Sequence, residues 1–579
     1  MSNASIKPRT GAQILVDQLI RQEVTDIFCV PGESYLAVLD SLHDVEAKSS
    51  EVEAGSREDF ATQHPKIRVT VCRQEGGAAM MADAVGRLTG RPGICFVTRG
   101  PGATNASAGI HIAHQDSIPL ILFVGQIGRE MREREAFQEL NYRAVFGTMT
   151  KWATEIDDPR RIPEIVSRAF HVAMSGRPGP VVIALPEDML VELAEVADAP
   201  FVAPVPTAPS LSQMAELQKR LWAAKSPMVL VGGTRWDEAA VRSLVRFSER
   251  FDLPVAVSFR RQMLFPADHP NFAGDLGIGP NPALLKRFEE ADLILAIGAR
   301  LGEMPSQGYS LLDIPGDGSR LVHVHADIGE LGRVYAPVQA IHADAGSFCA
   351  ALEGLQPPNA LAWEGEATKA HASFEGWTEP KPIPGALQMG EVMAYLRETL
   401  PVDAIMTNGA GNYATWLHRF YRFRQFGTQA APTSGSMGYG LPAAVGAKRR
   451  FPERTVVCFA GDGCFMMHGQ EFATAVQYDL PIVVVLIDNG MYGTIRMHQE
   501  REYPGRVSAT ALKNPDFAAY ARAFGGHGET VRTTAEFAPA FERALASGKP
   551  AIVHCFIDPE AITPSTTISA LREKAKASK

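Results

Sequence analysis

The sequence predicts an α/β fold made of three doubly wound domains with mainly parallel sheets. Short apolar runs rich in β-branched residues recur along the chain, and stretches with helical periodicity separate them. This alternation is typical of parallel strands that helices cover on both faces. The runs fall into three groups, with a proline-rich stretch between each group and the next. A length of 579 residues also exceeds one domain, since domains of about 100–200 residues are usual.

The apolar runs predict four strands in each domain. In chain order these strands cover residues 26–30, 67–72, 93–98, 119–124, then 228–231, 254–258, 293–297, 321–325, and finally 402–406, 455–460, 481–487 and 550–557. We expect the domains to span residues 8–195, 210–365 and 386–565. Linkers are predicted at 198–210 and 379–385, where proline and polar residues collect. A polar insert at 46–66 should form a surface excursion or a mobile loop.

Composition and charge narrow the class of protein. The net charge is −9 and no long basic run occurs, which argues against nucleic acid or an anionic membrane as the main partner. The seven cysteines include no C-x-x-C pair, a usage that favours free thiols in a reducing compartment over a disulfide framework or a zinc site. The chain has no apolar stretch long enough to span a bilayer and no signal-like start. We therefore expect a cytoplasmic protein.

The strongest motif lies in the third domain. The strand predicted over 455–460 runs into Gly-Asp-Gly at 461–463, and the strand over 481–487 ends at Asp-Asn, residues 488–489. In doubly wound sheets ligands bind beyond the carboxyl ends of the strands. Carboxylate and amide oxygens ligate Mg²⁺ or Ca²⁺, and glycines at a helix start let a phosphate approach the N–H groups. A simple turn is the alternative for Gly-Asp-Gly alone, but the paired strand ends favour a metal–diphosphate site.

A second candidate lies in the first domain. Glu75 follows the strand predicted over 67–72 and precedes a helical stretch that begins with Gly76 and Gly77. A carboxylate at this position often does no more than stabilise the start of a helix. The residues by themselves leave that alternative open.

Seven segments together resemble the thiamine diphosphate-dependent enzymes, and among them the acetolactate synthase-like branch. They are FCVPG at 28–32, CRQEGGAA at 72–79, VTRGPGATN at 97–105, DSIPLILFVGQ at 116–126, AFQE at 136–139, SMGYGLPA at 436–443 and GDGCF at 461–465. The resemblance extends from about residue 10 to about residue 564. It is specific for the superfamily and less specific for one reaction.

The resemblance implies pyrimidine-binding, central and diphosphate-binding domains, in that order. It implies that Asp462, Asn489 and the main-chain carbonyl of Met491 hold Mg²⁺ or Ca²⁺. Glu75 would hydrogen-bond the aminopyrimidine ring and so promote loss of the thiazolium proton. The active site would form between the first domain of one subunit and the third domain of another, in a homodimer or homotetramer.

Further residues are carried over from the same resemblance. Those that would contact the cofactor are Gly435, Met437, Gly461 and Gly463, with Met437 as the apolar wedge that bends it. Those near the substrate would be the backbone of Gly32 and the side chains of Gln126 and Gln138. Glu33 stands where decarboxylating relatives carry an acid, although a helix-start charge is the alternative. Either His111 or His114 would shuttle protons near neutral pH, with a structural histidine as the alternative.

Two departures from the family pattern leave alternatives open. The tryptophan that selects the acceptor in acetolactate synthases of branched-chain biosynthesis is absent, and His498 falls nearest its position. Gly298-Ala299-Arg300 resembles the arginine motif of FAD-binding members, but the next three residues depart from it. FAD, ADP or no nucleotide in the central domain therefore all stay open.

The leading hypothesis is decarboxylation of a small 2-oxo acid followed by carboligation to a second carbonyl compound. The alternatives are a non-ligating 2-oxo acid decarboxylase and a 2-hydroxyacyl-CoA lyase or oxalyl-CoA decarboxylase-type enzyme, which Glu33 and the missing tryptophan favour. A silent binding protein on the same fold is a third class. An intact Glu75 together with Asp462 and Asn489 argues against it.

Overall fold

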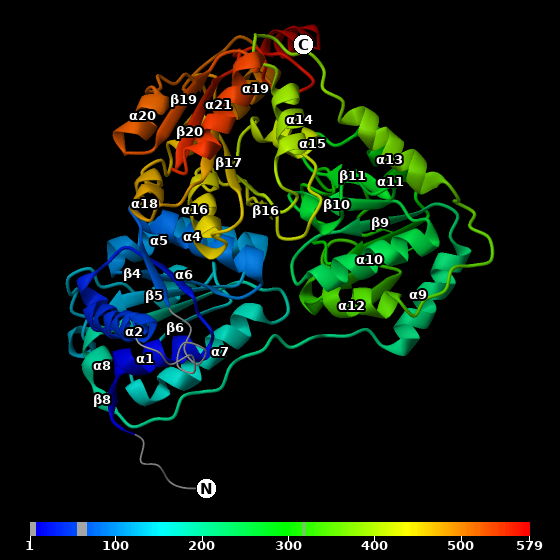
Figure 1. Cartoon of the computed structure of the whole chain (residues 1–579). Helices are drawn as coiled ribbons and strands as arrows, with labels where there is room; N and C mark the ends of the chain where they lie inside the picture. Colours follow the sequence, from blue (N-terminus) through cyan, green and yellow to red (C-terminus); the bar gives the residue numbers. More distant parts are fainter. Residues whose placement is uncertain (1–6, 55–66, 317–318, 579) are drawn as a thin grey trace. The chain divides into compact units, whose positions relative to one another are not determined.

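Three six-stranded sheets, each with all of its strands parallel, organise the computed structural model of the chain (Figure 1). The structure describes residues 7–54, 67–316 and 319–578. It divides into two compact units, which are Met1–Val205 with Val445–Pro452 and Gln470–Leu480, and Pro206–Ala444 with Glu453–Gly469 and Pro481–Lys579. The three parallel sheets confirm the predicted α/β class.

The first unit contains the sheet ordered β3-β2-β4-β5-β7-β6. Its strands are β2 (Asp26–Cys29), β3 (Arg68–Val71), β4 (Gly93–Val97), β5 (Leu120–Gln126), β6 (Trp152–Glu155) and β7 (Pro180–Pro186). Helices α1 (Gly11–Arg21) and α7 (Ile162–Met174) share one apolar core with alternate strand residues. Helices α4 (Glu75–Thr89) and α5 (Gly100–Asp116) pack on each other and on β4 and β5. A short antiparallel pair, β1 (Arg9–Thr10) with β8 (Leu193–Ala194), completes the unit.

Helix α18 (Glu471–Gln477) also belongs to the first unit, although it follows the third domain's motif in sequence. The carboxylate of its fully buried first residue, Glu471, accepts a hydrogen bond from the main-chain N–H of Arg73 at 3.1 Å. The main-chain N–H of Val71 donates to the Tyr478 hydroxyl at 2.8 Å. Burial raises the pKa of Glu471. These contacts fix the end of β3, where α4 begins.

The second unit holds two sheets, and the first of them has the order β11-β10-β9-β12-β13-β14. Its strands are β9 (Pro227–Val231), β10 (Val255–Ser258), β11 (Phe272–Leu276), β12 (Leu293–Ile297), β13 (Leu321–His325) and β14 (Gln339–His342). Numbered along the chain this is 3-2-1-4-5-6, the strand order of dinucleotide-binding sheets. Helices α10 (Glu238–Phe251) and α12 (Ala345–Leu352) cover one face, and α11 (Pro282–Glu290) and α13 (Glu366–Trp377) pack on the other.

The other sheet of the second unit has the order β16-β15-β17-β18-β20-β19. Its strands are β15 (Ile405–Asn408), β16 (Gln429–Ala430), β17 (Val456–Gly461), β18 (Val483–Asp488), β19 (His527–Val531) and β20 (Ala551–Phe556). Numbered along the chain within each sheet, this order and that of the first unit's sheet are both 2-1-3-4-6-5. One apolar cluster contains side chains from both sheets of the second unit, so these two sheets share a core.

All twelve predicted strands are present, and the predicted bounds differ from the observed ones by a few residues. Besides the short pair β1 and β8, the sequence did not predict six strands of the parallel sheets, which are β6, β7, β11, β14, β16 and β19. Five of them lie at sheet edges, where β6, β14 and β19 are only partly buried and their apolar runs are correspondingly weak. The exception, β7, is fully buried, but prolines stand at both of its ends, and proline ordinarily argues against a central strand.

For the predicted insert at 46–66, the mobile-loop alternative is wrong over residues 46–54. Helix α2 (Leu36–Ala54) continues through the first part of that stretch, and residues 55–66 lie outside the described residues. Residues 195–210 and 378–388 form neither helix nor strand, as expected for linkers. The exact limits of the domains stay predictions. The seven cysteines, all described, are buried and free.

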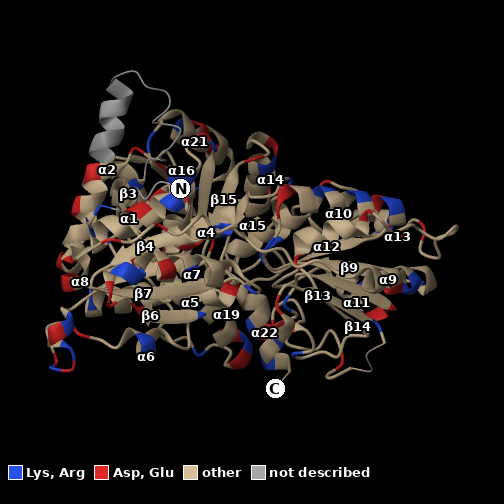
Figure 2. Cartoon of the chain, turned by 90° about the horizontal axis from the view of Figure 1, so that it is seen from below, with Lys and Arg blue, Asp and Glu red and all other residues tan. Residues whose placement is uncertain are grey.

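Charged residues of both signs are distributed along the chain (Figure 2), and helix α10 carries several of them. On that helix Arg242 lies 3.5 Å from Glu238, and Arg246 pairs with Glu353. Within the described ranges, none of the helices combines the length and the apolarity that crossing a membrane requires.

Candidate active site

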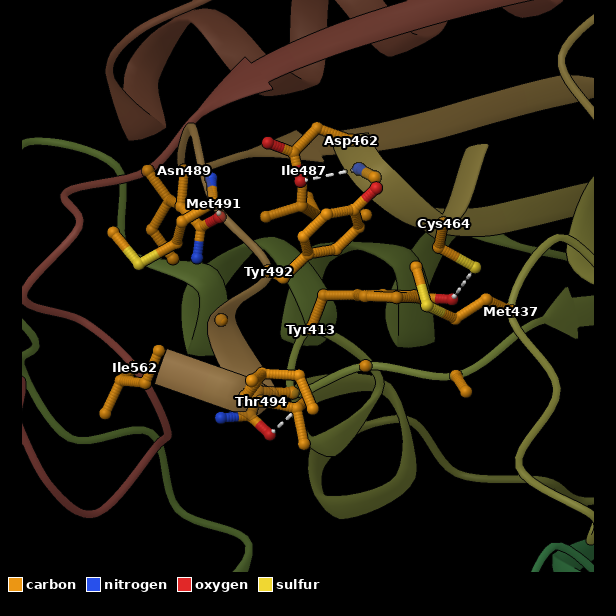
Figure 3. Close-up of a pocket in the computed structure, with 18 of the residues that line it drawn as sticks. Tyr413, Met437, Asp462, Cys464, Ile487, Asn489, Met491, Tyr492, Thr494 and Ile562 are labelled. Carbon is orange, nitrogen blue, oxygen red and sulfur yellow. Dashed lines mark hydrogen bonds between the residues drawn. The ribbon is translucent and has the colours of Figure 1, made fainter. Parts of the chain in front are cut away.

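A pocket of about 240 Å³ lies in the second unit at the carboxyl ends of β15, β17 and β18 (Figure 3). The loop after β15 contributes Asn412 and Tyr413, the loop after β17 contributes Asp462, and the loop after β18 contributes Asn489 and the residues that follow. This is the edge at which doubly wound sheets bind ligands. The motifs that the sequence singled out in the third domain therefore line one cavity.

The Gly-Asp-Gly loop has room only for glycine at its outer positions. A Cβ added to Gly463 would lie 2.6 Å from the Tyr492 ring, and one added to Gly461 would lie 2.6 Å from the Tyr413 ring. Gly435, across the pocket, has a φ of 69° and nothing within 4 Å of an added Cβ. Bare main chain therefore borders the pocket at these positions, as a bound phosphate requires.

Asp462, Asn489 and Met491 lie near one another at one side of the pocket (Figure 3). The Asp462 carboxylate accepts a hydrogen bond from the Gly463 N–H at 2.8 Å, and the Asn489 side-chain oxygen accepts one from the Met491 N–H at 3.2 Å. A carboxylate, an amide and main-chain carbonyls are hard oxygen donors, which Mg²⁺ and Ca²⁺ prefer. No group of three or more His, Cys, Asp and Glu in the described parts of the chain is arranged to hold a metal. The mixed donor set is thus the chain's best candidate.

A second layer of polar contacts supports Asp462. The Asn514 amide donates to Asp462 at 2.7 Å and to Asp488 at 2.8 Å, and Asp488 lies 2.9 Å from the ring Nε2 of buried His554. Burial raises the pKa of Asp462, and the neighbouring Asp488 charge adds to the rise. Burial also opposes ionisation of Asp488, but hydrogen bonds from His554, the Gly490 N–H and Asn514 hold its pKa below the usual value. Asp488 therefore loses its proton at a lower pH than Asp462 does.

Met437 lies across the pocket from Asn489 and Met491 (Figure 3). Its side chain is partly buried against the unit's apolar core. Beside it, Cys464 accepts hydrogen bonds from the Gly438 N–H and the Tyr413 hydroxyl, each at 3.2 Å. The pocket wall opposite the oxygen donors is thus apolar, and the apolar core and the hydrogen bonds of Cys464 hold it in place.

Helix α19 (Gly493–Glu502) continues from the pocket loop and is anchored by a buried carboxylate. Glu500 is fully buried, and Arg496 and Arg572 contact it at 2.8 and 2.7 Å. The Gly505 N–H also donates to it, at 2.9 Å. Hydrogen bonds from Arg572 and Arg496 hold its pKa at about 2. Because Arg572 lies on the C-terminal helix α22 (Ile568–Ala577), this ion cluster ties the end of the chain to the helix beside the pocket.

In the first unit, Glu75 is the first residue of α4 at the carboxyl end of β3. The helix cap is the preceding residue, Gln74, whose side chain accepts from the Gly77 N–H at 3.0 Å. The Glu75 carboxylate instead accepts a hydrogen bond from the Asn105 amide at 3.0 Å. A Cβ added to Gly102 would lie 3.4 Å from Glu75. The capping alternative is thereby weakened, because another side chain already fills that role.

Gly32 and Gln138 lie at the same strand ends. A Cβ added to Gly32 would come within 2.4 Å of the Thr98 side chain, so the loops after β2 and β4 touch there. The main-chain oxygen of Gln138 accepts from the Gly100 N–H at 3.1 Å, and Gln138 has a φ of 65°. The structure therefore brings Gly32 and Gln138 to the same first turns of α5 that border Glu75.

Four other predicted residues have different surroundings. Glu33 forms an ion pair with buried Arg99. Buried Gln126 donates from its side chain to the Leu140 main-chain oxygen at 3.0 Å, so it holds a loop. His114 lies in the last turn of α5, nine residues beyond Asn105, which is roughly 13 Å along a helix. The structure does not bring His114 or the exposed His111 to Glu75.

In the central sheet, the loops after β9 and β12 meet at the point where the strand order reverses. A Cβ added to Gly233 would lie 2.0 Å from the Gly298 oxygen, and the Trp236 indole donates to the Gly232 oxygen at 2.8 Å. The next helix, α10, is capped by Asp237, whose carboxylate accepts from the Ala240 N–H at 2.7 Å. An acidic cap and an indole thus surround the helix start at this position.

Comparison with known families follows the same division into three domains. Three family models match, described as the thiamine pyrophosphate enzyme N-terminal binding domain (residues 9–145), central domain (214–352) and C-terminal binding domain (409–555). The Escherichia coli protein named acetolactate synthase isozyme 2 large subunit is 31% identical over 554 residues, or 95% of each chain. The chain belongs to the thiamine pyrophosphate enzyme family.

Other family members agree with this assignment. The Parasynechococcus marenigrum acetolactate synthase large subunit is 32% identical over 559 residues, which cover 94% of this chain and 87% of the relative. The Corynebacterium glutamicum acetolactate synthase large subunit is 31% identical over 575 residues. This thiamine pyrophosphate enzyme is accordingly of the acetolactate synthase type.

The sequence does not assign a role to three residues of this thiamine pyrophosphate enzyme that support or line its candidate site. Asn105 ends one of the segments that carry the resemblance, but its contact with Glu75, like that of Asn514 with Asp462, joins residues far apart in the chain. Tyr413 was overlooked although it follows a predicted strand in the sequence Gly-Asn-Tyr. Its position after that strand was a usable signal.

Proposed function

We propose that this enzyme decarboxylates a small 2-oxo acid and joins the retained fragment to a second carbonyl compound, with thiamine diphosphate and Mg²⁺. The observation that carries the proposal is the convergence of Asp462, Asn489 and Met491 in one pocket, opposite Met437. Glu33 and the missing tryptophan favour the alternatives, a non-ligating decarboxylase and a 2-hydroxyacyl-CoA lyase or oxalyl-CoA decarboxylase-type enzyme. The ion pair of Glu33 with Arg99 makes Glu33 less suited to act as a free acid, so the missing tryptophan is the remaining support for them.

The pocket residues fit the cofactor and its cation. Bound thiamine diphosphate supplies the electron sink on which a 2-oxo acid loses CO₂. Asp462, Asn489 and the Met491 carbonyl would hold the cation, and the glycine main chain at 461 and 463 would face the diphosphate. Gly435 would offer main-chain groups to the pyrimidine, and Met437 would press on the middle of the cofactor.

Glu75 would hold the proton that the cofactor's pyrimidine ring requires. Its carboxylate is oriented by the Asn105 amide at 3.0 Å. We place Gly32 and Gln138 beside the substrate on the same basis, and we assign no role to His114. We further propose that Glu75 reaches the pocket from a second copy of the chain. Exposed large apolar side chains next to Gln138 in the first unit and next to the Gly-Asp-Gly loop in the second support such contacts, since Phe137 is 72% exposed and Met466 49% exposed.

We propose that the central domain holds no dinucleotide at its strand-order reversal. A dinucleotide's diphosphate would need the helix start that follows β9. The Asp237 carboxylate already caps that helix, and the Trp236 indole lies against the adjoining loop. A diphosphate there would meet a negative charge instead of free N–H groups. FAD and ADP therefore do not fit this position, and a flavin band in the visible spectrum of the purified protein would contradict the proposal.

The experiment for the main proposal supplies the protein with ¹³C-pyruvate, thiamine diphosphate and Mg²⁺ and identifies the product by NMR. We expect CO₂ and acetolactate. Acetaldehyde as the only organic product would replace carboligation with simple decarboxylation. Absence of any turnover, together with absence of cofactor binding, would overturn the proposal.

A further inference from the structure

A second cavity, of about 320 Å³, adjoins the cofactor pocket within the second unit. Both cavities are lined by Gly411 and Asn412. Asn412 is held in place, because its side-chain oxygen accepts from the Thr494 hydroxyl at 2.9 Å and its amide lies 3.4 Å from the Met497 sulfur. The second cavity therefore adjoins the pocket, and one fixed side chain lies at their common wall. Its size falls within the range of about 300–1,000 Å³ of small-molecule sites.

The wall of this cavity carries a cation with no protein counter-charge. Arg419, on α15 (Ala414–Phe420), is half-buried and stacks on the Trp377 ring, with its guanidinium carbon 3.6 Å from the ring centroid. It donates only to the Trp377 main-chain oxygen at 3.0 Å and the Ser565 hydroxyl at 3.3 Å, and no carboxylate among the described residues pairs with it. Burial lowers the pKa of Arg419, with no acid to oppose it. A half-buried guanidinium of this kind is stabilised by an anion.

Other charged groups around the cavity give it a positive balance. Arg501 of α19 contacts His498 at 3.3 Å and has no carboxylate partner in the described structure. Arg260 is buried in the same wall and donates to the Pro432 oxygen. The one acid of the lining is Asp275, whose pKa burial raises to about 7. Three guanidinium groups thus face one carboxyl group that is only partly ionised at neutral pH.

We propose that this cavity binds an anionic group, a carboxylate or a phosphate, at the far end of a carbonyl substrate longer than pyruvate. The reacting carbonyl would lie in the cofactor pocket, so this inference rests on the proposed function. The Phe259, Phe374 and Trp377 rings would contact the apolar middle of the substrate, and Arg419 would bind the anion. Guanidinium groups bind both anions in a bidentate way. The cavity would then set substrate length and charge.

The test compares substrates that differ only in the distal anion. The holoenzyme with thiamine diphosphate and Mg²⁺ is given 2-oxo diacids of five to seven carbons and 2-oxo monoacids of equal length, each as donor and, with pyruvate, as acceptor. Glyceraldehyde 3-phosphate against glyceraldehyde tests the phosphate. We expect the substrates with a distal carboxylate, or the substrate with a distal phosphate, to have a higher kcat/KM than the matched substrates without that anion. The expected factor is about 10- to 100-fold, the range of one charge-assisted hydrogen bond. Which series is preferred identifies the anion.

The variant Arg419→Gln should abolish most of this preference through a higher KM for the anionic substrate. The matched control is Arg422→Gln, since Arg422 is paired with Asp268 at 3.2 Å and lies outside the cavity lining. The control should keep the wild-type preference. No preference in the wild type, or an equal preference in Arg419→Gln, would overturn the inference. Loss of bound flavin on Arg419→Gln would also overturn it, because the cavity would then hold a cofactor.

Calorimetry separates failure of this inference from failure of the proposed function. Heats of binding are measured for the same diacids and monoacids in the presence of thiamine diphosphate and Mg²⁺, where turnover can occur, and in their absence, where it cannot. If thiamine diphosphate binds but diacids bind no better than monoacids, only the inference fails. If thiamine diphosphate does not bind, the proposed function fails, and a diacid preference that is lost in Arg419→Gln would still support the anion site.

Discussion

The sheet of the first unit and the last sheet of the second unit have the same strand order, 2-1-3-4-6-5, yet their strand ends carry different chemistry. In the last sheet the third strand ends in Gly-Asp-Gly and the fourth ends beside Asn489. In the first sheet the third strand is followed by Thr98 and Arg99, and the fourth ends at Gln126, whose amide holds a loop. The acid of the first sheet, Glu75, follows the second strand instead.

This difference shows how one topology can serve two tasks. An acid and an amide at the ends of neighbouring central strands can hold a cation, because their oxygens converge. A single acid after the second strand has an amide partner, Asn105, and belongs to no metal-binding group of three or more His, Cys, Asp and Glu among the described residues. The Glu75 carboxylate is therefore suited to hold a proton on one of its oxygen atoms. Under the proposed assignments, the position of the carboxylate along the sheet edge distinguishes metal binding from proton transfer.

The largest effect expected from this comparison is that of Asp462→Ala. Removal of the only carboxylate of the donor set should abolish Mg²⁺-dependent binding of thiamine diphosphate, because the diphosphate loses its neutralising cation. Thermal stabilisation by cofactor plus Mg²⁺ measures this. Asp403→Ala, at the opposite end of β15, is the control and should behave as wild type. An unchanged stabilisation in Asp462→Ala would disprove the metal assignment.

Glu75→Gln should separate the two tasks. The variant should bind thiamine diphosphate and Mg²⁺ as the wild type does, yet lose about 10²–10⁴-fold in rate, as expected for a positioned proton-transfer group. Steady-state rates and hydrogen–deuterium exchange at the thiazolium carbon measure the loss. A wild-type rate would refute the role of Glu75. Loss of cofactor binding would show that Glu75 has a structural role instead.

Glu500→Gln should loosen the C-terminal helix. Breaking a buried ion pair costs about 3 kcal/mol. If this destabilises α22 locally, its amides should exchange roughly 100-fold faster, which hydrogen-exchange mass spectrometry measures. The depressed pKa, about 2, is below that of a glutamate in an unfolded chain, about 4.3, so this stabilisation is complete above pH ~4.3 and is lost as the pH falls toward 2. The exposed Glu573→Gln is the control. Equal exchange in both variants would be evidence against the anchor.

The smallest effect is expected from the asparagines that contact the two acids. Asn514→Ala should weaken Mg²⁺ affinity by about 10- to 100-fold, as loss of a residue that orients a ligand does. Asn105→Ala, its counterpart beside Glu75, should lower the rate and leave Mg²⁺ affinity unchanged. Calorimetric titration with Mg²⁺ at saturating thiamine diphosphate distinguishes them. Equal Mg²⁺ affinities in the two variants would remove the distinction drawn between the two sheets.

The sequence predicted the fold class and the cores of the sheets well, because fully buried strands such as β12 and β17 are continuous apolar runs. Edge strands such as β19 show only a weak alternation of apolar and polar residues, so the sequence did not predict them. Asp462, Asn489 and Glu75 were recognisable because each directly follows a predicted strand or a glycine motif. Asn514 and Arg419 were not, because their contacts join residues far apart in the chain, and no local pattern records such pairings.

The central claim is that Glu75 of one copy and Asp462 of another act in the same active site. A heterodimer that combines a Glu75→Gln copy with an Asp462→Ala copy tests it most directly, with differently tagged chains co-expressed and purified together. One of its two sites would contain both substitutions and the other neither. We predict that the heterodimer recovers about half of the wild-type activity, although each variant alone is inactive. A heterodimer as inactive as the two parent variants would contradict the claim.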